Sequence, residues 1–340
     1  MSAHLRVLSA GPAMSIQDLG REGHLAFGLT RGGAADRLAL FEGAALLGQP
    51  AECATIEMVG MGGTFEATAD TIIALTGARM AATLDGAPMV WNASHTLPAG
   101  AKLVIGGAQT GTYGYLHIAG GFDTPLYMGA RATHLTAQIG AVLKTGDDIA
   151  FRPSTPARSG YFLLPDTRFQ GGAVRVTPSF QSEHFSQETR NRFCQTTFRR
   201  DPRSNRQGVR MDADAPGFYA EGGLSIVSEV ITTGDIQVAG DGAPYVLMCE
   251  SQTTGGYPRI GTVIPSDLPK VAQAPVGTVI EFEFISHDTA IEIEKRIRNE
   301  IKTLSSRAQP LVRDPHDIPD LLAYQLISGT VSATADPFAS

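Results

Sequence analysis

Arg206 lies in a polar stretch whose side chains are suited to binding an anion. It follows Ser204 and Asn205 in "SNRQGVR", and three more arginines precede the stretch. A guanidinium presents a planar fork of N–H donors that matches a carboxylate or a phosphate. The pattern therefore predicts either an anion-binding loop, with Arg206 as a catalytic residue, or a solvated basic loop.

A second polar stretch, "QTTGGYP", stands between two apolar runs. Its members are Gln252, Thr253, Thr254, Gly255, Gly256 and Tyr257, followed by Pro258. The amide and the two hydroxyls can donate to an oxyanion, the two glycines can expose backbone N–H groups as an anion-binding nest, and the tyrosine can cover an apolar ligand face. A hairpin turn is the alternative, because Gly-Gly is common in turns. A turn needs no such set of donors, so the stretch favours a ligand-binding loop, with Gln252, Thr253 and Thr254 as catalytic candidates.

A third candidate cluster lies near the N-terminus. Asp18 and Arg21 can pair across a turn, and Asp36 precedes an apolar periodic segment as a helix N-cap would. The cluster predicts either a structural turn with a helix cap or part of a substrate site.

Several common catalytic motifs are missing from the sequence. No lysine follows a glycine, so there is no P-loop, and no lysine is flanked by methionine as in a biotin acceptor. The eight histidines are dispersed, and none pairs with another at metal-ligand spacing. We expect no metal site, and any nucleotide must be held in another way.

Composition narrows the class of protein. The chain has 340 residues, 43% of them hydrophobic, and a formal net charge of -7. This length suffices for two ordinary domains, and the absence of a basic run argues against nucleic acid as a partner. The three cysteines are scattered, and no stretch has the length of a membrane span or the core of a signal peptide. We expect a cytoplasmic protein that binds a small molecule or another protein.

Short apolar runs separated by glycine and proline predict a mainly β fold. Helical periodicity is confined to residues 34–48, 182–195, 286–304 and 317–327. In the third of these, Asp288 is the expected cap, and Ile291 and Ile297 are expected to face inward.

A weak internal sequence repeat suggests two related β domains. Asp85-Gly86-Ala87-Pro88 recurs as Asp241-Gly242-Ala243-Pro244, although Asp-Gly is also common turn chemistry. The Pro- and Ser-rich stretch 151–160 is a candidate linker. We therefore predict a β domain over residues 1–155, a second over 156–290, and a C-terminal helix and tail over 291–340.

Taken in order, these stretches resemble a known family, the biotin-dependent carboxyltransferase subdomain A/B family, also called allophanate hydrolase subunit 2 or the KipA family. The resemblance covers about residues 5–290. It rests on "SIQDLGREGH", "GLTRGGAADR", "IALTGARMAATLDGAP", "YGYLHIAGGFDTPLYMGARATHL" and "SNRQGVRM", and on the segment from "SEVITTGDIQVAGDGAP" through "CESQTTGGYPRIGTVIPSDLP". It implies two cyclophilin-like β-barrel domains with a few peripheral helices.

The resemblance also implies a function. Many members are the C subunit of 5-oxoprolinase, which acts with a KipI-type partner and a LamB/YcsF-type partner. The assembled complex opens 5-oxoproline to L-glutamate with ATP and Mg²⁺. Other members are carboxyltransferase parts of urea carboxylase, where biotin is carried on another domain, or regulators that antagonise a KipI-type kinase inhibitor. All three functions remain open on the sequence.

This sequence departs from the family pattern at several positions. It has Gly43-Ala44 where Ala-Asn is common, and Glu250 where an aspartate is frequent. Such changes are compatible with an altered substrate or with a member that has lost catalysis.

Overall fold

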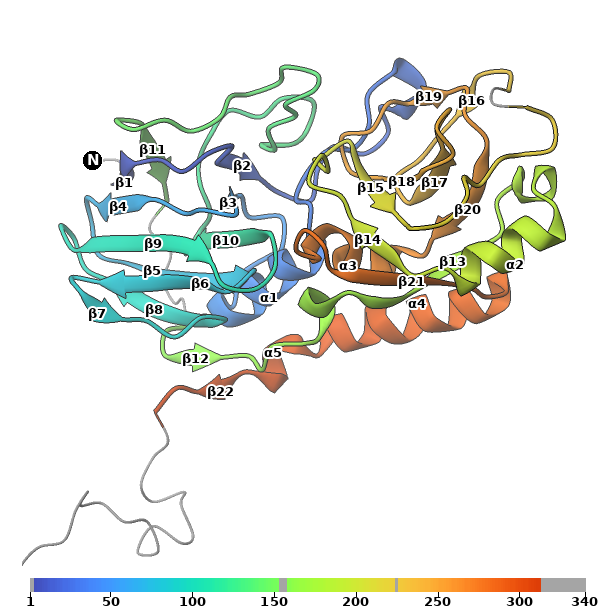
Figure 1. Ribbon diagram of the computed structural model, residues 1–340. Coiled ribbons are helices and arrows are strands. Elements are labelled where there is room, and N and C mark those ends of the chain that lie inside the picture. The colour runs from blue at the N-terminus through green and yellow to red at the C-terminus, as the bar shows by residue number, and fades with distance from the viewer. Residues whose placement is uncertain (1–2, 153–157, 224–225, 313–340) are drawn as a thin grey trace, which may run out of the picture.

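The computed structural model describes residues 3–152, 158–223 and 226–312, and it is mainly β, as predicted (Figure 1). The N-terminal half holds two sheets. One has the order β11-β1-β4-β9-β6-β7 and the other the order β2-β3-β10-β5-β8-β12-β22. The strands are β1 (Ala3–Ser9), β2 (Ser15–Gln17), β3 (Thr55–Val59), β4 (Thr64–Ala67), β5 (Thr71–Gly77), β6 (Met80–Leu84), β7 (Ala87–Pro88), β8 (Ala93–Leu97), β9 (Lys102–Ala108), β10 (Tyr113–Ile118), β11 (Asp148–Phe151), β12 (Tyr161–Phe162) and β22 (Gln309–Pro310).

The C-terminal half is a closed barrel of the order β13-β20-β17-β18-β15-β14-β21. Its strands are β13 (Gly172–Thr177), β14 (Phe198–Arg200), β15 (Gly208–Asp212), β17 (Asp235–Val238), β18 (Pro244–Leu247), β20 (Arg259–Val263) and β21 (Val279–Phe284). A separate two-stranded sheet joins β16 (Glu229–Val230) to β19 (Thr254–Gly255). Inward-facing residues alternate along the barrel strands, and five buried or partly buried phenylalanines pack together inside it: Phe193, Phe198, Phe218, Phe282 and Phe284.

Five α-helices of the described chain lie outside the sheets: α1 (Arg37–Leu47), α2 (Gln187–Gln195), α3 (Leu268–Gln273), α4 (His287–Lys302) and α5 (Leu304–Arg307). Short 3₁₀ turns are η1 (Leu25–Phe27), η2 (Arg168–Gln170), η3 (Ser182–His184) and η4 (Pro265–Asp267). Helix α1 confirms the expected cap, because the Asp36 carboxylate accepts from the amides of Leu38 and Ala39, and Gly48 ends the helix at φ +68°.

The prediction for α4 was wrong in two details. Its cap is Ser286, whose hydroxyl accepts from the amide of Thr289, and Asp288 lies in the first turn instead. Ile291 is 50% exposed, whereas Ile297 lines a cavity as expected. Ile291 and Ile297 are six residues apart in one helix, a spacing that places them on different faces of the helix, so only one of them can face inward. The predicted helix at 317–327 lies outside the described residues.

The chain crosses between the halves more than once. Strand β12 comes after the predicted linker yet pairs with β8, and β22 near the C-terminus pairs with β12. Both strands therefore extend a sheet of the N-terminal half (Figure 1). The two repeated Asp-Gly pairs are both hairpin turns, Asp85-Gly86 between β6 and β7 and Asp241-Gly242 between β17 and β18. Their structural equivalence stays a prediction.

Gly43 explains one departure from the family pattern. It lies on the buried face of α1, where a Cβ atom would run into the imidazole of His117 on β10. His117 is itself buried, and its Nε2 lies 2.7 Å from the Thr76 hydroxyl. The missing methyl group therefore lets α1 pack against a polar side chain in the sheet.

Candidate functional site

Arg206 joins the two halves through ion pairs. Its Nε donates to Glu250 over 2.6 Å, one Nη donates to Glu57 on β3, and the other donates to the Gly33 carbonyl over 2.5 Å. Burial by itself would lower the pKa of Arg206, but Cys249, Glu57 and Glu250 raise it well above the usual value. Burial likewise opposes ionisation of Glu250, but Arg206 holds the pKa of this carboxyl below its usual value. The predicted anion-binding fork is thus already occupied by carboxylates of the chain itself.

A second buried network lies next to Arg206. Glu57 accepts from the Tyr115 hydroxyl over 2.8 Å and from the Ala35 amide over 2.8 Å. The Tyr115 oxygen in turn accepts from the Asp36 amide over 2.8 Å. The Asp36 side chain also accepts from Arg168 Nε and from Gln273 Nε2, each over 2.8 Å. The side chain of Asp36 therefore caps α1 and bridges the halves, and it has no free oxygen for a metal or a substrate.

Asp18 and Arg21 do not form the predicted pair. Asp18 accepts from the amides of Gly20, over 2.8 Å, and Arg131, over 2.6 Å. Arg21 is buried, and it donates to the backbone carbonyls of Tyr127 and Ala132. The short turn directs the two side chains to different backbone partners. Each carboxylate oxygen of Asp18 accepts one backbone amide and the side chain is buried, so Asp18 shapes the turn.

Ser204 and Asn205 shape the turn between β14 and β15. The Ser204 hydroxyl donates to the Asp201 carbonyl over 2.7 Å, and Asn205 Oδ1 accepts from the amides of Gln207 and Gly208. This is the side-chain-to-backbone bonding typical of an Asx turn. The structure gives both residues a structural role, and a substrate-binding role for them stays a prediction.

The predicted binding loop is not a hairpin between barrel strands. Thr254 and Gly255 form β19, which pairs with β16, so this part of the loop is extended. Neither Gly255 nor Gly256 has positive φ, and the predicted backbone nest is therefore not formed. Gly255 instead leaves room for a neighbour, because a Cβ there would press on the side-chain amide of Gln237, which would have to move.

The side chains of this loop remain available to a ligand. Gln252 and Thr254 are exposed, Thr253 is half-buried, and their polar side-chain atoms have no hydrogen-bond partner among the described residues. Tyr257 is 46% exposed. The loop begins beside Ser251, whose carbonyl accepts from the Thr30 hydroxyl over 3.1 Å. It therefore lies at the edge of the cleft between the halves, next to the segment that contains η1.

A hydrogen-bond relay fixes this edge of the cleft. His134 Nδ1 accepts from the Ala137 amide over 3.1 Å, so Nε2 carries the proton and donates to the Thr30 hydroxyl over 3.0 Å. That hydroxyl then donates to the Ser251 carbonyl. Glu250 is held from the same side, because it accepts from the amide and hydroxyl of Thr136. The longer glutamate, where the family often has aspartate, reaches Thr136 and Arg206 together.

A cavity of about 380 Å³ opens in the cleft between the halves. Its N-terminal wall contains Arg21, Arg31 and Arg37, and its C-terminal wall contains Cys249 and Thr232. Burial lowers the pKa of Arg31, and burial followed by repulsion from Arg31 lowers that of Arg37 to about 10. Burial raises the pKa of the Cys249 thiol to about 11, so this cysteine is not an activated nucleophile. The cavity is strongly cationic.

Arg31 and Arg37 were missed by the sequence-based site prediction. Both lie in "GLTRGGAADR", the segment that was interpreted through its glycines and its helix cap. The sequence does hold a signal for these residues: Arg31 directly precedes a Gly-Gly pair, and Arg37 directly follows the predicted helix cap. Long-range contacts decide which arginines pair with carboxylates of the same chain. The spacing of residues in the sequence does not reveal these contacts.

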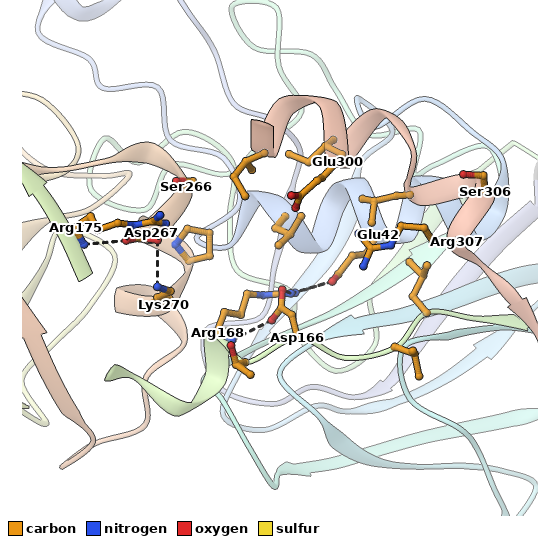
Figure 2. Close-up of a pocket in the computed structure, with 18 of the residues that line it drawn as sticks. Glu42, Asp166, Arg168, Arg175, Ser266, Asp267, Lys270, Glu300, Ser306 and Arg307 are labelled. Atoms are coloured by element: carbon orange, nitrogen blue, oxygen red, sulfur yellow. Dashed lines mark hydrogen bonds and ion pairs between the residues drawn. The ribbon is translucent and has the colours of Figure 1, made fainter. Parts of the chain in front are cut away.

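A second cavity, of about 530 Å³, lies beneath α4 and α5. Figure 2 shows its charged side chains pointing at one another: Arg168 is paired with Glu42 and Asp166, and Asp267 with Arg175 and Lys270. Since these charges are mutually neutralised, the cavity is better explained as a structural junction than as an anion site.

Within residues 3–152, 158–223 and 226–312, no group of three or more His, Cys, Asp or Glu side chains is arranged to hold a metal ion. In the same ranges, no helix is both long enough and apolar enough to cross a membrane.

The fold and the cleft define a β-rich protein of two halves with a polar cavity between them. The carboxyltransferase domain, subdomain A and B, matches residues 27–284. The chain therefore belongs to this family.

Individual relatives give finer detail. The chain is 32% identical over 299 residues to the C subunit of 5-oxoprolinase from Haemophilus influenzae, and the match covers 87% of this chain and 95% of that protein. It is 27% identical over 324 residues to the urea amidolyase of Saccharomyces cerevisiae, covering 88% of this chain but only 18% of that protein. The crystal structure of TTHA0988 superposes with a TM-score of 0.74 at 28% identity, over 83% of this chain and 56% of that one. This chain thus spans about half of TTHA0988.

Proposed function

We propose that this chain is the C subunit of an ATP-dependent 5-oxoprolinase, which opens 5-oxoproline to L-glutamate together with a KipI-type and a LamB/YcsF-type partner. The similarity to a relative of that name along 95% of its length carries the proposal. The coarser conclusion, a role in a hydrolase complex, follows from the same relatives.

The chemistry sets what the complex must provide. A lactam amide is resonance-stabilised, and transfer of a phosphoryl group to its oxygen makes the carbon open to attack by water. The complex must hold the substrate carboxylate, donate hydrogen bonds to the reacting oxygen and neutralise the transferring phosphoryl group. The free side chains of Gln252, Thr253 and Thr254 are suited to the second task.

The described residues of this chain offer no complete site for Mg²⁺-ATP. The sequence has no P-loop, and Asp18 and Asp36 already accept hydrogen bonds at both carboxylate oxygens. We therefore assign nucleotide binding to the assembled complex, with groups supplied by the partner proteins.

Exposed apolar side chains support a heteromeric protein. Phe27 of η1 is 84% exposed, Leu126 61%, Met128 49% and Val230 of β16 59%. Each belongs to a segment that contacts the cleft loops: the Tyr127 carbonyl accepts from Arg21, and β16 pairs with β19. Exposed apolar side chains of this size are suited to burial against a partner protein.

Reconstitution tests the proposal. The chain is purified alone and with its cognate KipI-type and LamB/YcsF-type partners, and ATP hydrolysis is measured with 5-oxoproline, with urea and without substrate. We expect negligible 5-oxoproline-dependent hydrolysis from the chain alone and robust hydrolysis from the complex. Full activity of the isolated chain, or a complex indifferent to 5-oxoproline, contradicts it.

The similarity to urea amidolyase favours one second candidate, carboxyl transfer to urea or another amide from carboxybiotin carried on a different protein. The same loop donors suit this reaction. Urea-dependent turnover that requires a biotin carboxylase and a biotin carrier, and not the LamB/YcsF-type partner, would select it.

A further inference from the structure

Three arginines face the cleft cavity without carboxylate partners. Within the described part of the chain, the guanidinium groups of Arg31 and Arg37 form no ion pair and no hydrogen bond, and their Nε atoms are buried. Arg21 is 2% exposed, and its Nη1 is also buried without a partner. Buried donors are almost always satisfied, so unpaired ones lining a cavity take acceptors from water or from a ligand inside it.

Backbone hydrogen bonds fix the main chain around Arg21 and Arg31. The Arg21 amide donates to the Arg31 carbonyl over 2.9 Å, and the Gly32 amide donates to the Cys249 carbonyl over 3.0 Å. Gly33 has φ +78°, and a Cβ on it would lie 2.6 Å from the backbone nitrogen of Gly20. The two loops therefore pack back to back, which only glycine permits here. The main-chain positions of Arg21 and Arg31 are therefore set before an anion binds, which lowers the cost of ordering the site.

One carboxylate offsets the positive charge only in part. Glu22 lines the cavity and attracts both Arg31 and Arg37, but it is exposed and forms no ion pair in the described ranges, so three arginines face a single carboxylate there. The exposed Thr232 adds a hydroxyl group. A cavity lined by both arginines and apolar side chains suits a small organic anion with a compact hydrocarbon ring. The apolar part of the lining is formed by Leu25, Leu29, Leu268 and Pro269.

We propose that Arg21, Arg31 and Arg37 form an oxyanion-binding site in the cleft, which holds the carboxylate of a small cyclic amide or a phosphate group. The assignment of the carboxylate to 5-oxoproline rests on the proposed function. The oxyanion site itself rests on the arginines alone. Arg31 and Arg37 bind the oxyanion, and Arg21 closes the inner end of the site.

Calorimetric titration of the full chain, alone and in the reconstituted complex, tests the site. The probes are 5-oxoproline, inorganic phosphate and the neutral lactam 2-pyrrolidinone, which lacks the carboxylate. The variants are Arg31→Gln and Arg37→Gln. Arg37→Lys keeps the charge without the planar fork, and Arg298→Gln on α4 is the matched control, because Arg298 is exposed and forms no ion pair among the described residues.

We expect each glutamine variant to weaken oxyanion binding by about tenfold to a hundredfold, the range for losing a charge-assisted hydrogen bond. Arg37→Lys should give a smaller loss, the Arg298 variant none, and 2-pyrrolidinone should bind far more weakly than 5-oxoproline. Circular dichroism confirms that the variants are folded. Competition between 5-oxoproline and phosphate assigns the site to the substrate carboxylate, whereas binding of phosphate alone assigns it to a phosphoryl group.

The experiments can contradict the oxyanion site and the proposed 5-oxoprolinase function independently of each other. No oxyanion binding to the chain or the complex, or unchanged binding in both glutamine variants, overturns the site even if the complex hydrolyses ATP with 5-oxoproline. Conversely, phosphate binding that the variants weaken keeps the site, even if the complex proves inactive on 5-oxoproline.

Discussion

Four arginines between the two halves form two groups with opposite surroundings. Arg206 and Arg168 are buried, and each meets two or three carboxylates of the chain. Arg31 and Arg37 line the cleft cavity and meet none in the described chain. The first group is part of the structure that joins the halves, and the second is available for binding. Residue type alone therefore does not identify a site, whereas the pairing state of the residue does.

The largest effect is expected at Arg206. Arg206→Met removes the cation but leaves Glu57 and Glu250 buried, so the free energy of unfolding should fall by about 3–5 kcal/mol, the usual cost of breaking a buried ion pair. Urea denaturation of the isolated chain measures it, with Arg298→Met as control. A loss below about 1 kcal/mol would show that Arg206 does not belong to the structural group, and would return it to the predicted catalytic role.

Thr254 extends the comparison to the exposed loop. Its hydroxyl, like the guanidinium groups of Arg31 and Arg37, has no partner among the described residues, so Thr254→Val should leave the unfolding temperature of the chain unchanged. If the hydroxyl donates to a developing negative charge, turnover in the assembled complex should fall by roughly a hundredfold. Normal turnover of the Thr254→Val complex in a steady-state ATP hydrolysis assay would leave the loop threonine with no catalytic part.

His117, in the N-terminal half, is a buried side chain that has a hydrogen-bond partner and can also gain a proton. Burial lowers the pKa of His117 from 6.5 to about 3. Between these values the unfolded chain binds a proton that the native chain does not, so stability must fall as the pH falls below about 6.5. From pH 7 to pH 5 this group should cost about 2 kcal/mol. Urea denaturation at both pH values should show that this dependence is smaller in His117→Asn, and an equal dependence would contradict it.

The sequence predicted the strand-rich fold, the Asp36 cap and helix α1 because local chemistry determines them. A cap needs only its own first turn, and short apolar runs between turn residues indicate strands wherever they pair. The site was harder. Arg206 and Arg31 have similar local sequences, each near glycine and polar residues, and only the long-range approach of Glu57 and Glu250 separates them. The nest at Gly255-Gly256 failed for the same reason, because pairing with β16 extends a segment that looks like a turn.

Among the arginines compared, the smallest effect on stability is expected at Arg37. Arg37→Met keeps the apolar stem of the side chain but removes a charge that is partly buried and unpaired in the described chain. Arg37 forms no ion pair in the described chain, and the repulsion from Arg31 that is relieved outweighs the attraction to Glu22 that is lost, so the free energy of unfolding should stay within about 0.5 kcal/mol of the natural chain or rise slightly. Urea denaturation, as for Arg206→Met, measures the free energy of unfolding of Arg37→Met. The informative result is how the change at Arg37 compares with the change at Arg206. A loss of about 3 kcal/mol or more at Arg37 would mean that it is as structural as Arg206, and the cleft would then contain one group of arginines rather than two.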